Sequence, residues 1–152
     1  MKKINAVLAA AAFTILALFA APGAAQATVH SSPGSAAAAA PDGYLYAWQH
    51  KDRGGYWCRW FGNDANWSTC SGSSSSLNMR NVASSLENRG YAGAYEDVDL
   101  FYHPNYTGSN ICLWNGRYLN NLTGIYFPWD GKDGQGQSTN DNIASHRWSN
   151  NC

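Results

Sequence analysis

The feature that most constrains this chain is a short pattern that occurs twice. Residues 101–108 read FYHPNYTG and residues 48–55 read WQHKDRGG, and an offset of 53 places Gly55 on Gly108. An aromatic residue that enters a tight bend, with a glycine shortly after it, is typical of a strand that folds over into a hairpin. Two such hairpins indicate that one structural unit of about 50 residues is repeated.

A second pattern is repeated further along each unit. Residues 80–85 read RNVASS and residues 141–146 read DNIASH, and matching their letters gives an offset of 61, which pairs Ser84 with Ser145. The additional residues fit in the glycine-rich segment 124–139. Each unit is therefore predicted to contain an aromatic strand, a glycine fold-over, two more strands and an Asn-x-x-Ser turn into a last strand. This is a Greek key, formed twice.

The strands themselves are predicted from alternation of side chains along the chain. No segment has the apolar period of a helix longer than two turns. Abundant aromatic residues, separated by Gly, Ser and Asn, favour short strands and tight turns. The predicted strands cover residues 44–50, 56–61, 98–103, 110–114 and 117–122, with shorter strands ending near Cys70, near Arg89 and at the last cysteine.

The N-terminal part of the chain has a different composition. Two lysines precede an apolar run, and Ala25, Gln26 and Ala27 have the small-x-small form of a signal peptidase site. We therefore expect a signal peptide over residues 1–27 and secretion of the mature protein. Residues 28–41 are low in complexity and are predicted to be a spacer. The remaining residues, 42–152, suffice for one compact domain.

Charge and motif content limit the function. Beyond the lysines of the signal peptide the chain has eight basic and ten acidic side chains and no basic patch, so we expect no nucleic-acid partner and no membrane association of the mature, monomeric protein. Glu96, Asp97 and Asp99 are interpreted as a solvated strand edge. No nucleophile motif or phosphate-binding loop is present. We expect a protein that is not an enzyme and requires no cofactor.

All four cysteines follow the predicted signal peptide. An even number in an exported chain indicates disulfides. Among the three possible connectivities we favour Cys58–Cys70, which closes a short loop, and Cys112–Cys152, which ties the C-terminus to a strand of the second unit. A tetrahedral zinc site is the alternative, but no C-x-x-C or H-x-x-x-H spacing supports it.

These patterns resemble the βγ-crystallin superfamily, in which a Greek key carries an aromatic-x4-aromatic-x-Gly hairpin and a later Asn/Asp-Asn/Asp-x-x-Ser/Thr-Ser segment. Phe101, Tyr106 and Gly108 fit the hairpin, whereas the first unit has Arg53 where the second ring is expected. Stretches such as DGYLYAWQH, GGYWCRW and YEDVDLFYHPNYTG are similar to the secreted bacterial metalloproteinase-inhibitor family built on that fold. The resemblance implies an all-β, disulfide-stapled double Greek key sandwich, with motif one at 42–90 and motif two at 91–152.

The resemblance also implies a candidate calcium site. In calcium-binding relatives the ligands come from a leading polar side chain, the carbonyl after the polar pair and the Ser/Thr hydroxyl. Carried over to this sequence, the candidate ligands are Asn81, Val82, Ser84, Asp141, Asn142, Ile143 and Ser145. Arg80 stands where Asn or Asp is expected, and His146 replaces the last Ser. With one carboxylate, we expect at most weak Ca²⁺ binding; the alternative is that these residues only cap turns.

Two functions from different classes remain. The first is inhibition of a secreted metalloproteinase, for which Tyr126, Phe127 and Trp129 in the segment 124–139 are the candidate contacts. The alternative for this segment is that its aromatic residues fold back into the core. The second function is an extracellular module that binds calcium or a glycan and does not inhibit, since tryptophans in a small secreted domain can stack on sugars or simply fill the core.

Overall fold

The structure is a computed structural model in which residues 39–74 and 77–150 are described. The predicted signal peptide 1–27, most of the predicted spacer 28–41 and Cys152 lie outside these residues, so the predictions made for them stay predictions. In the described part of the chain, no helix is long and apolar enough to cross a membrane.

The described residues form strands joined by loops and two short 3₁₀ helices. The elements are β1 (Tyr44–His50), η1 (Lys51–Arg53), β2 (Gly54–Trp60), β3 (Ser71–Gly72), β4 (Ser85–Arg89), β5 (Asp97–His103), η2 (Pro104–Tyr106), β6 (Thr107–Leu113), β7 (Tyr118–Leu119) and β8 (Ser145–Ser149). The first four strands come from the first predicted unit and the last four from the second. The all-β prediction is confirmed.

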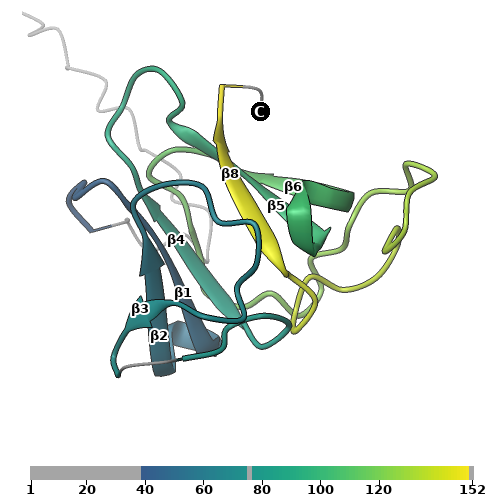
Figure 1. The fold of residues 1–152 in the computed structure, drawn as a ribbon, viewed down its shortest axis with the longest axis horizontal. Helices are drawn as coiled ribbons and strands as arrows, with labels where there is room; N and C mark the ends of the chain where they lie inside the picture. The colour runs from purple at the N-terminus through teal and green to yellow at the C-terminus, as the bar shows by residue number, and fades with distance from the viewer. Residues whose placement is uncertain (1–38, 75–76, 151–152) are drawn as a thin grey trace, which may run out of the picture. The chain divides into compact units, whose positions relative to one another are not determined.

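The strands pair into two antiparallel sheets (Figure 1). One sheet has the order β3-β2-β1-β4-β7 and the other has the order β6-β5-β8. In the first sheet, β3-β2-β1-β4 is the order of a Greek key, because the fourth strand returns to lie beside the first. The order β6-β5-β8 repeats β2-β1-β4 in the second unit. The predicted double Greek key is therefore confirmed.

One segment of each unit, between its second and last long strands, pairs with the sheet of the other unit. β7 pairs with β4, with Leu119 opposite Leu86. In return, Asp64 forms two backbone hydrogen bonds with His146 of β8, at 3.0 and 2.9 Å. Residues 62–67, predicted only as a turn, are thus an extension of the second sheet. The sequence patterns do not indicate this exchange.

Both fold-over hairpins adopt the same backbone conformation. Asp52 and Arg53 in η1 have φ of 58° and 61°, and Asn105 and Tyr106 in η2 both have φ of 60°. Non-glycine residues seldom occupy this left-handed region, so a pair of them in each corner is a specific shared feature. Gly108 follows with φ of 80°, as the sequence pattern predicts.

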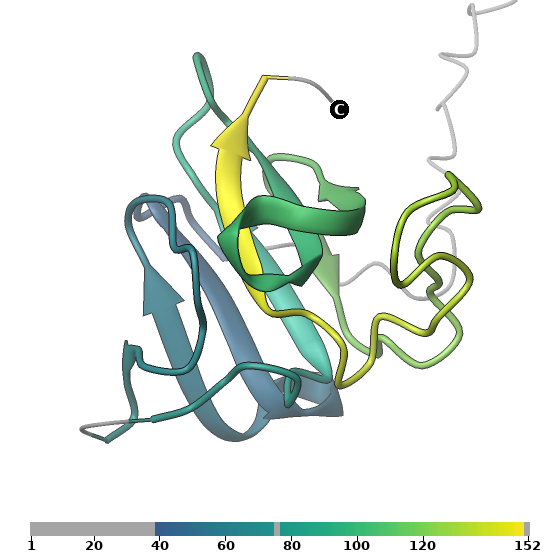
Figure 2. The same ribbon diagram turned by 45° about the vertical axis from the view of Figure 1, so that its right-hand side comes forward.

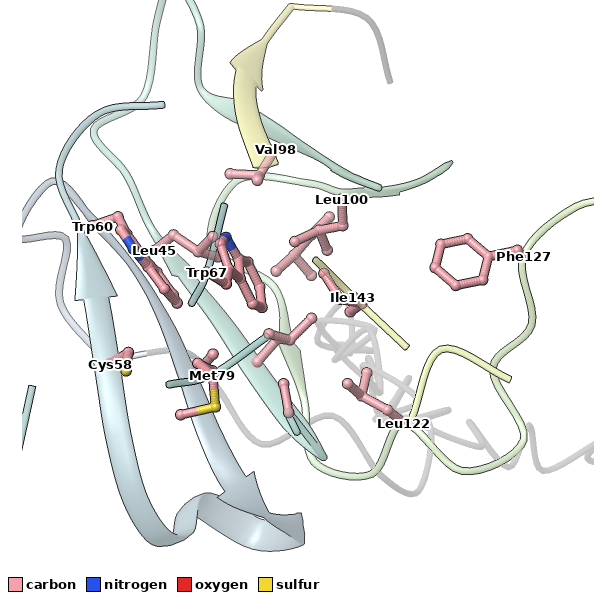
Figure 3. Packing of buried hydrophobic residues seen from close by; sticks show 14 residues of the cluster. Leu45, Cys58, Trp60, Trp67, Met79, Val98, Leu100, Leu122, Phe127 and Ile143 are labelled. Atoms are coloured by element: carbon pink, nitrogen blue, oxygen red, sulfur yellow. The ribbon is translucent and has the colours of Figure 1, made fainter. Parts of the chain in front are cut away.

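The core lies between the two sheets (Figure 3). Its largest fully buried side chain is Trp67, which stacks on Trp60 with ring centroids 4.5 Å apart. The indole Nε1–H of Trp67 donates to Nδ1 of the buried His146 at 2.8 Å. The Nε2 of His146 therefore carries the proton and donates to the carbonyl of Gly62 at 2.9 Å. The core is thus fixed by rings and by one satisfied polar pair.

A disulfide joins Cys58 of β2 to Cys70, as the sequence predicts. It connects the buried side of β2 to the loop that carries Trp67. Cys112 lies in β6, and its predicted partner Cys152 is outside the described residues, so that second pairing stays a prediction.

Candidate functional site

The two Asn/Asp turns lie side by side and are related by an approximate two-fold axis. The N–H of Asn81 donates to the carbonyl of Ile143 at 2.9 Å, and the N–H of Asp141 donates to the carbonyl of Ala83 at 3.0 Å. Asn81 and Asp141 also share the left-handed conformation, with φ of 57° and 59°. Since Asn81 corresponds to Asp141 and Ala83 to Ile143, the structural offset between the units here is 60 residues.

The predicted offset of 61 in this region is therefore wrong by one residue. The Ser85 hydroxyl donates to the carbonyl of His50 at 2.8 Å and accepts from the N–H of Arg53. The Ser145 hydroxyl donates to the carbonyl of His103 at 2.6 Å and accepts from the N–H of Tyr106 in the same corner. Ser145 thus corresponds to Ser85. Its hydroxyl holds a hairpin corner, which corrects its assignment as a calcium ligand equivalent to Ser84.

In this corrected register, Ser84 and Asp141 come together from different units. The Asp141 carboxylate accepts hydrogen bonds from the Ser84 hydroxyl and from the Asn140 side-chain amide, the latter at 2.7 Å. Burial raises the pKa of Asp141, and these two hydrogen bonds and the nearby His50 partly oppose that rise. A hollow of about 520 Å³ lies beside them, lined by His50, Lys51, Ser84, Asn121, Thr123 and Asn140.

The opposite side of the two-fold axis lacks this chemistry. Asn81 takes the place of Asp141, and Ala144 takes the place of Ser84, because the N–H groups of Ser84 and Ala144 bond the equivalent carbonyls of β1 and β5. Arg80 stands where the other side has Asn140. A cation and two uncharged side chains do not attract a metal ion. The two sides therefore differ in their capacity to bind one.

The other predicted calcium ligands take part in the backbone of the turns. The amide of Asn142 donates to the carbonyl of Ser138 at 2.9 Å, within its own turn. The carbonyl of Ile143 accepts from Asn81, and Val82 donates its N–H to the carbonyl of Met79. Within residues 39–74 and 77–150, no three His, Cys, Asp or Glu side chains are grouped as a metal site would require.

The segment 124–139 is a second candidate site, and its aromatic residues divide into two groups. Phe127 is 1 % exposed and packs edge-on against Tyr102, with ring centroids 5.6 Å apart. Its ring points toward the central cluster of the core (Figure 3). Tyr126 and Trp129, in contrast, are 60 % and 83 % exposed. Phe127 is a core residue, which corrects its assignment as a contact; Tyr126 and Trp129 remain available.

Backbone hydrogen bonds hold this segment in one conformation. Phe127 pairs with the opposite arm of the loop, accepting from the N–H of Gly136 at 3.0 Å and donating to the carbonyl of Gln137 at 2.9 Å. Ser109 of β6 fixes the tip, since its N–H donates to the carbonyl of Asp133 and its hydroxyl donates to that of Pro128. The loop, in yellow-green, extends away from both sheets in Figures 1 and 2. It presents two rings on a fixed support.

Sequence reasoning missed a third cluster of aromatic side chains. Phe61, Tyr91, Tyr95 and Trp148 line one hollow together. Two of them flank the small residues of the segment GYAGAYE between β4 and β5, which the sequence indicated only as a link between the units. Aromatic residues in an otherwise small-residue linker are a signal that was available, but the contributions of Phe61 and Trp148 required the fold.

No protein-family profile and no curated protein matches this chain. Among solved structures it is similar to one described under the evolution of the eye lens βγ-crystallin domain fold, at 18 % identity and a TM-score of 0.49, covering 75 % of this chain and 91 % of the other. It is also similar to a βγ-crystallin from an archaeon, at 15 % identity and a TM-score of 0.47, covering 69 % and 95 %. A third is spherulin 3a from Physarum polycephalum, at 18 % identity and a TM-score of 0.45, covering 75 % and 90 %.

Proposed function

We propose that this chain is a secreted, non-enzymatic binding protein that inhibits a metalloproteinase by inserting the tip of the segment 124–139 into the enzyme cleft. The observation that carries the proposal is the display of Tyr126 and Trp129, 60 % and 83 % exposed, on a loop anchored by the buried Phe127. An inhibitor loop has to keep its shape in the cleft, and a preorganised loop loses less entropy on binding.

Different residues of the loop supply its rigidity and its contact surface, which supports this proposal. Phe127 and the backbone bonds to Gly136 and Gln137 supply rigidity. Trp129 contributes a large aromatic surface of the kind that dominates binding energy at interfaces. Its indole lies against Gly136, where any Cβ would collide with the ring.

The test is titration of the purified chain against a thermolysin-type metalloproteinase, with residual cleavage of a peptide substrate as the readout. We expect Trp129→Ala to weaken inhibition at least 10-fold and to leave the melting temperature unchanged, because the ring is exposed. Trp114→Ala is the matched control, since Trp114 is also an exposed tryptophan but lies outside the loop. Full peptidase activity at micromolar concentrations of the unaltered chain would reject the proposal.

A second candidate function is calcium binding at Ser84 and Asp141. It is favoured by the convergence of a carboxylate, a hydroxyl and the Asn140 amide beside a hollow, all of which are oxygen donors that Ca²⁺ accepts. With one carboxylate and with Lys51 lining the same hollow, we propose an affinity no better than the roughly 10⁻⁴–10⁻³ M of extracellular modules.

Calcium binding predicts that millimolar Ca²⁺ raises the melting temperature, because a ligand bound only by the folded state stabilises it. Asp141→Asn is expected to abolish this rise. Asn81→Asp is the matched variant, since it places a carboxylate at the pseudo-equivalent position beside Arg80. An equal rise in the unaltered chain and in Asp141→Asn would show that the ion binds elsewhere.

A further inference from the structure

Three of the exposed large aromatic side chains gather at one end of the sandwich. Phe61, Tyr91 and Tyr95 are 65 %, 60 % and 63 % exposed. Together with the half-buried Trp148 they line a groove of about 280 Å³. Phe61 follows β2, the two tyrosines lie between β4 and β5, and Trp148 is in β8. Four aromatic residues from three separate segments therefore converge only because of the fold.

Glycines form the floor of this groove. A Cβ on Gly43 would lie 2.8 Å from both the Phe61 and the Tyr91 ring, and a Cβ on Gly90 would lie 2.6 Å from the Trp148 ring. Real Cβ atoms do not approach so closely. The absent side chains at Gly43 and Gly90 thus let the rings stand directly on the backbone, and they leave a concave surface between them.

The tyrosine segment is held in a costly conformation. Tyr95 has φ of 58°, a left-handed conformation that a bulky side chain rarely adopts. Hydrogen bonds maintain it: the N–H of Tyr95 donates to the Asn150 side chain, and the N–H of Gly93 donates to the Glu96 carboxylate at 2.6 Å. Strained residues that a structure maintains are concentrated at functional sites.

The lining excludes most classes of ligand. It contains only aromatic, alanine and glycine residues, so a charged ligand would lose hydration without gaining an ion pair. The volume is at the lower end of the range for small-molecule sites. A helix about 10 Å wide does not fit into it. A small, neutral ligand with a flat apolar face remains.

A pyranose ring with equatorial hydroxyl groups has these properties. Its C–H groups form a flat apolar face, which the electron-rich face of an aromatic ring attracts, and its hydroxyl groups form a polar rim. Two asparagines outside the lining bond the backbone of groove residues. Asn63 and Asn150 each accept, through Oδ1, the backbone N–H of a groove residue, Trp148 and Tyr95 respectively, and their NH₂ groups are donors for sugar hydroxyls.

We infer that the groove between Phe61, Tyr91, Tyr95 and Trp148 is a carbohydrate site that takes one or two rings of a neutral, β-linked oligosaccharide. It shares no residue with the loop 124–139 or with the Ser84–Asp141 hollow. It stands whether or not the chain inhibits a peptidase.

The experiment is calorimetric titration of the full chain with chitotriose and with cellotriose, two neutral β-linked sugars. We expect a dissociation constant in the millimolar range or tighter for at least one of them. Tyr91→Ala is expected to weaken binding at least 10-fold, and Gly43→Ala to do the same by pushing the rings into the groove. Trp114→Ala, an exposed tryptophan outside the groove, is the matched control and leaves binding unchanged.

A second measurement does not depend on how well the variants fold. In ¹H–¹⁵N spectra of the unaltered chain, the saturating sugar is expected to shift the Trp148 indole N–H and the Gly43 and Gly90 amides while leaving the amides of the loop 124–139 in place. No heat and no shift with either sugar at 10 mM overturns the inference. So does a concentration-dependent dimer that Tyr91→Ala dissociates, since the groove would then bind a second copy of the chain.

Discussion

The two halves of the molecule have the same backbone and different chemistry. In both, a strand enters a corner with two left-handed residues, and a buried serine ties that corner to the last strand: Ser85 in the first half and Ser145 in the second. The side chains around this frame do not match. The hydrogen bonds of the main chain fix the fold, so the side chains can diverge wherever a different set fills the same space.

The difference is largest in the core. His146 takes the place of Leu86, because both lie one residue beyond the equivalent serines and both are fully buried. Trp67 takes the place of Leu122, since their N–H groups donate to the equivalent carbonyls of Ala144 and Ser84. The sheet that contains β4 and β7 therefore packs two leucines where the sheet that contains β8 packs the hydrogen-bonded Trp67–His146 pair. The corners differ as well, because Arg53 lies 5.7 Å from the Trp48 ring where Tyr106 packs edge-on against Phe101.

The largest expected effect comes from truncating Trp67, which tests whether equivalent core positions contribute differently to stability. We expect Trp67→Ala to lower the free energy of unfolding by about 3–5 kcal/mol, at the upper end of the range for core truncations. The variant loses the stacking on Trp60 and also leaves Nδ1 of His146 without its donor. Leu122→Ala, at the equivalent position, creates a cavity but strands no polar atom, and it is expected to cost less.

Both variants are measured by urea denaturation at pH 7.5, where His146 is neutral in the folded and unfolded states. Trp114→Ala, which removes a tryptophan that is 57 % exposed, is expected to change stability by no more than about 0.5 kcal/mol. If Leu122→Ala costs as much as Trp67→Ala or more, the polar pair contributes nothing beyond its volume, and the two halves are energetically alike.

The buried histidine also predicts a pH dependence that only the second half supplies. Burial lowers the pKa of His146 to about 3, partly opposed by its hydrogen bond to Gly62. Between pH 6.5 and 3 the unfolded chain binds a proton that the folded chain does not, so stability is complete above pH 6.5 and falls by about 1.4 kcal/mol for each pH unit below it. At pH 4.5 the loss is about 3 kcal/mol.

His146→Leu isolates this effect, because it installs the residue found at the equivalent position 86. Carboxylates such as Asp64, whose pKa is raised by burial, are present in both chains, and their contribution cancels in the difference. We expect the difference in unfolding free energy between the two chains to change steeply between pH 6.5 and 4 and to be flat above pH 7. A flat difference throughout would mean that His146 is protonated without cost in the folded state.

The double Greek key could be predicted from the sequence, because hairpin corners depend on local chemistry. The aromatic rings, the turn residues and Gly108 indicate where a strand folds over into a hairpin. The exchange of β7 and of residues 62–67 between the two sheets could not be predicted in the same way. β7 contains two residues of the predicted strand 117–122, and the 62–67 segment has no alternation, so neither indicates which sheet it joins. Which sheet they join depends on the contacts of Leu119 and Asp64 in the assembled sandwich.

The candidate sites show the same division between local and non-local information. The sequence placed Asp141 and Ser84 in the right turns, but their meeting depends on the two-fold arrangement. In the loop 124–139 it could not separate Phe127, which is buried, from Trp129, which is exposed, because a glycine-rich loop has no period that assigns residues to faces. The aromatic groove was missed for this reason too.

The smallest predicted effect tests the register itself. Letter matching pairs Ser84 with Ser145, because both units contain the dipeptide Ala-Ser, whereas the hydrogen bonds pair Ser85 with Ser145. We expect Ser85→Ala and Ser145→Ala to cost about 1–2 kcal/mol each, since each removes two half-buried hydrogen bonds to the backbone of a corner. Ser84→Ala is expected to cost at most about 0.5 kcal/mol, because the Asp141 carboxylate is exposed and water replaces the lost donor.

Each of the three variants removes one oxygen atom from the unaltered chain, so urea denaturation under identical conditions compares their losses directly. Equal losses for Ser85→Ala and Ser145→Ala, with a clearly smaller loss for Ser84→Ala, support the 60-residue register. The reverse result, in which Ser84 and Ser145 behave alike and Ser85 does not, would restore the offset of 61 and return Ser145 to the candidate calcium ligands. The serine variants that lose the most stability therefore decide the register, and with it the two-fold relation that distinguishes the Ser84–Asp141 hollow from its counterpart.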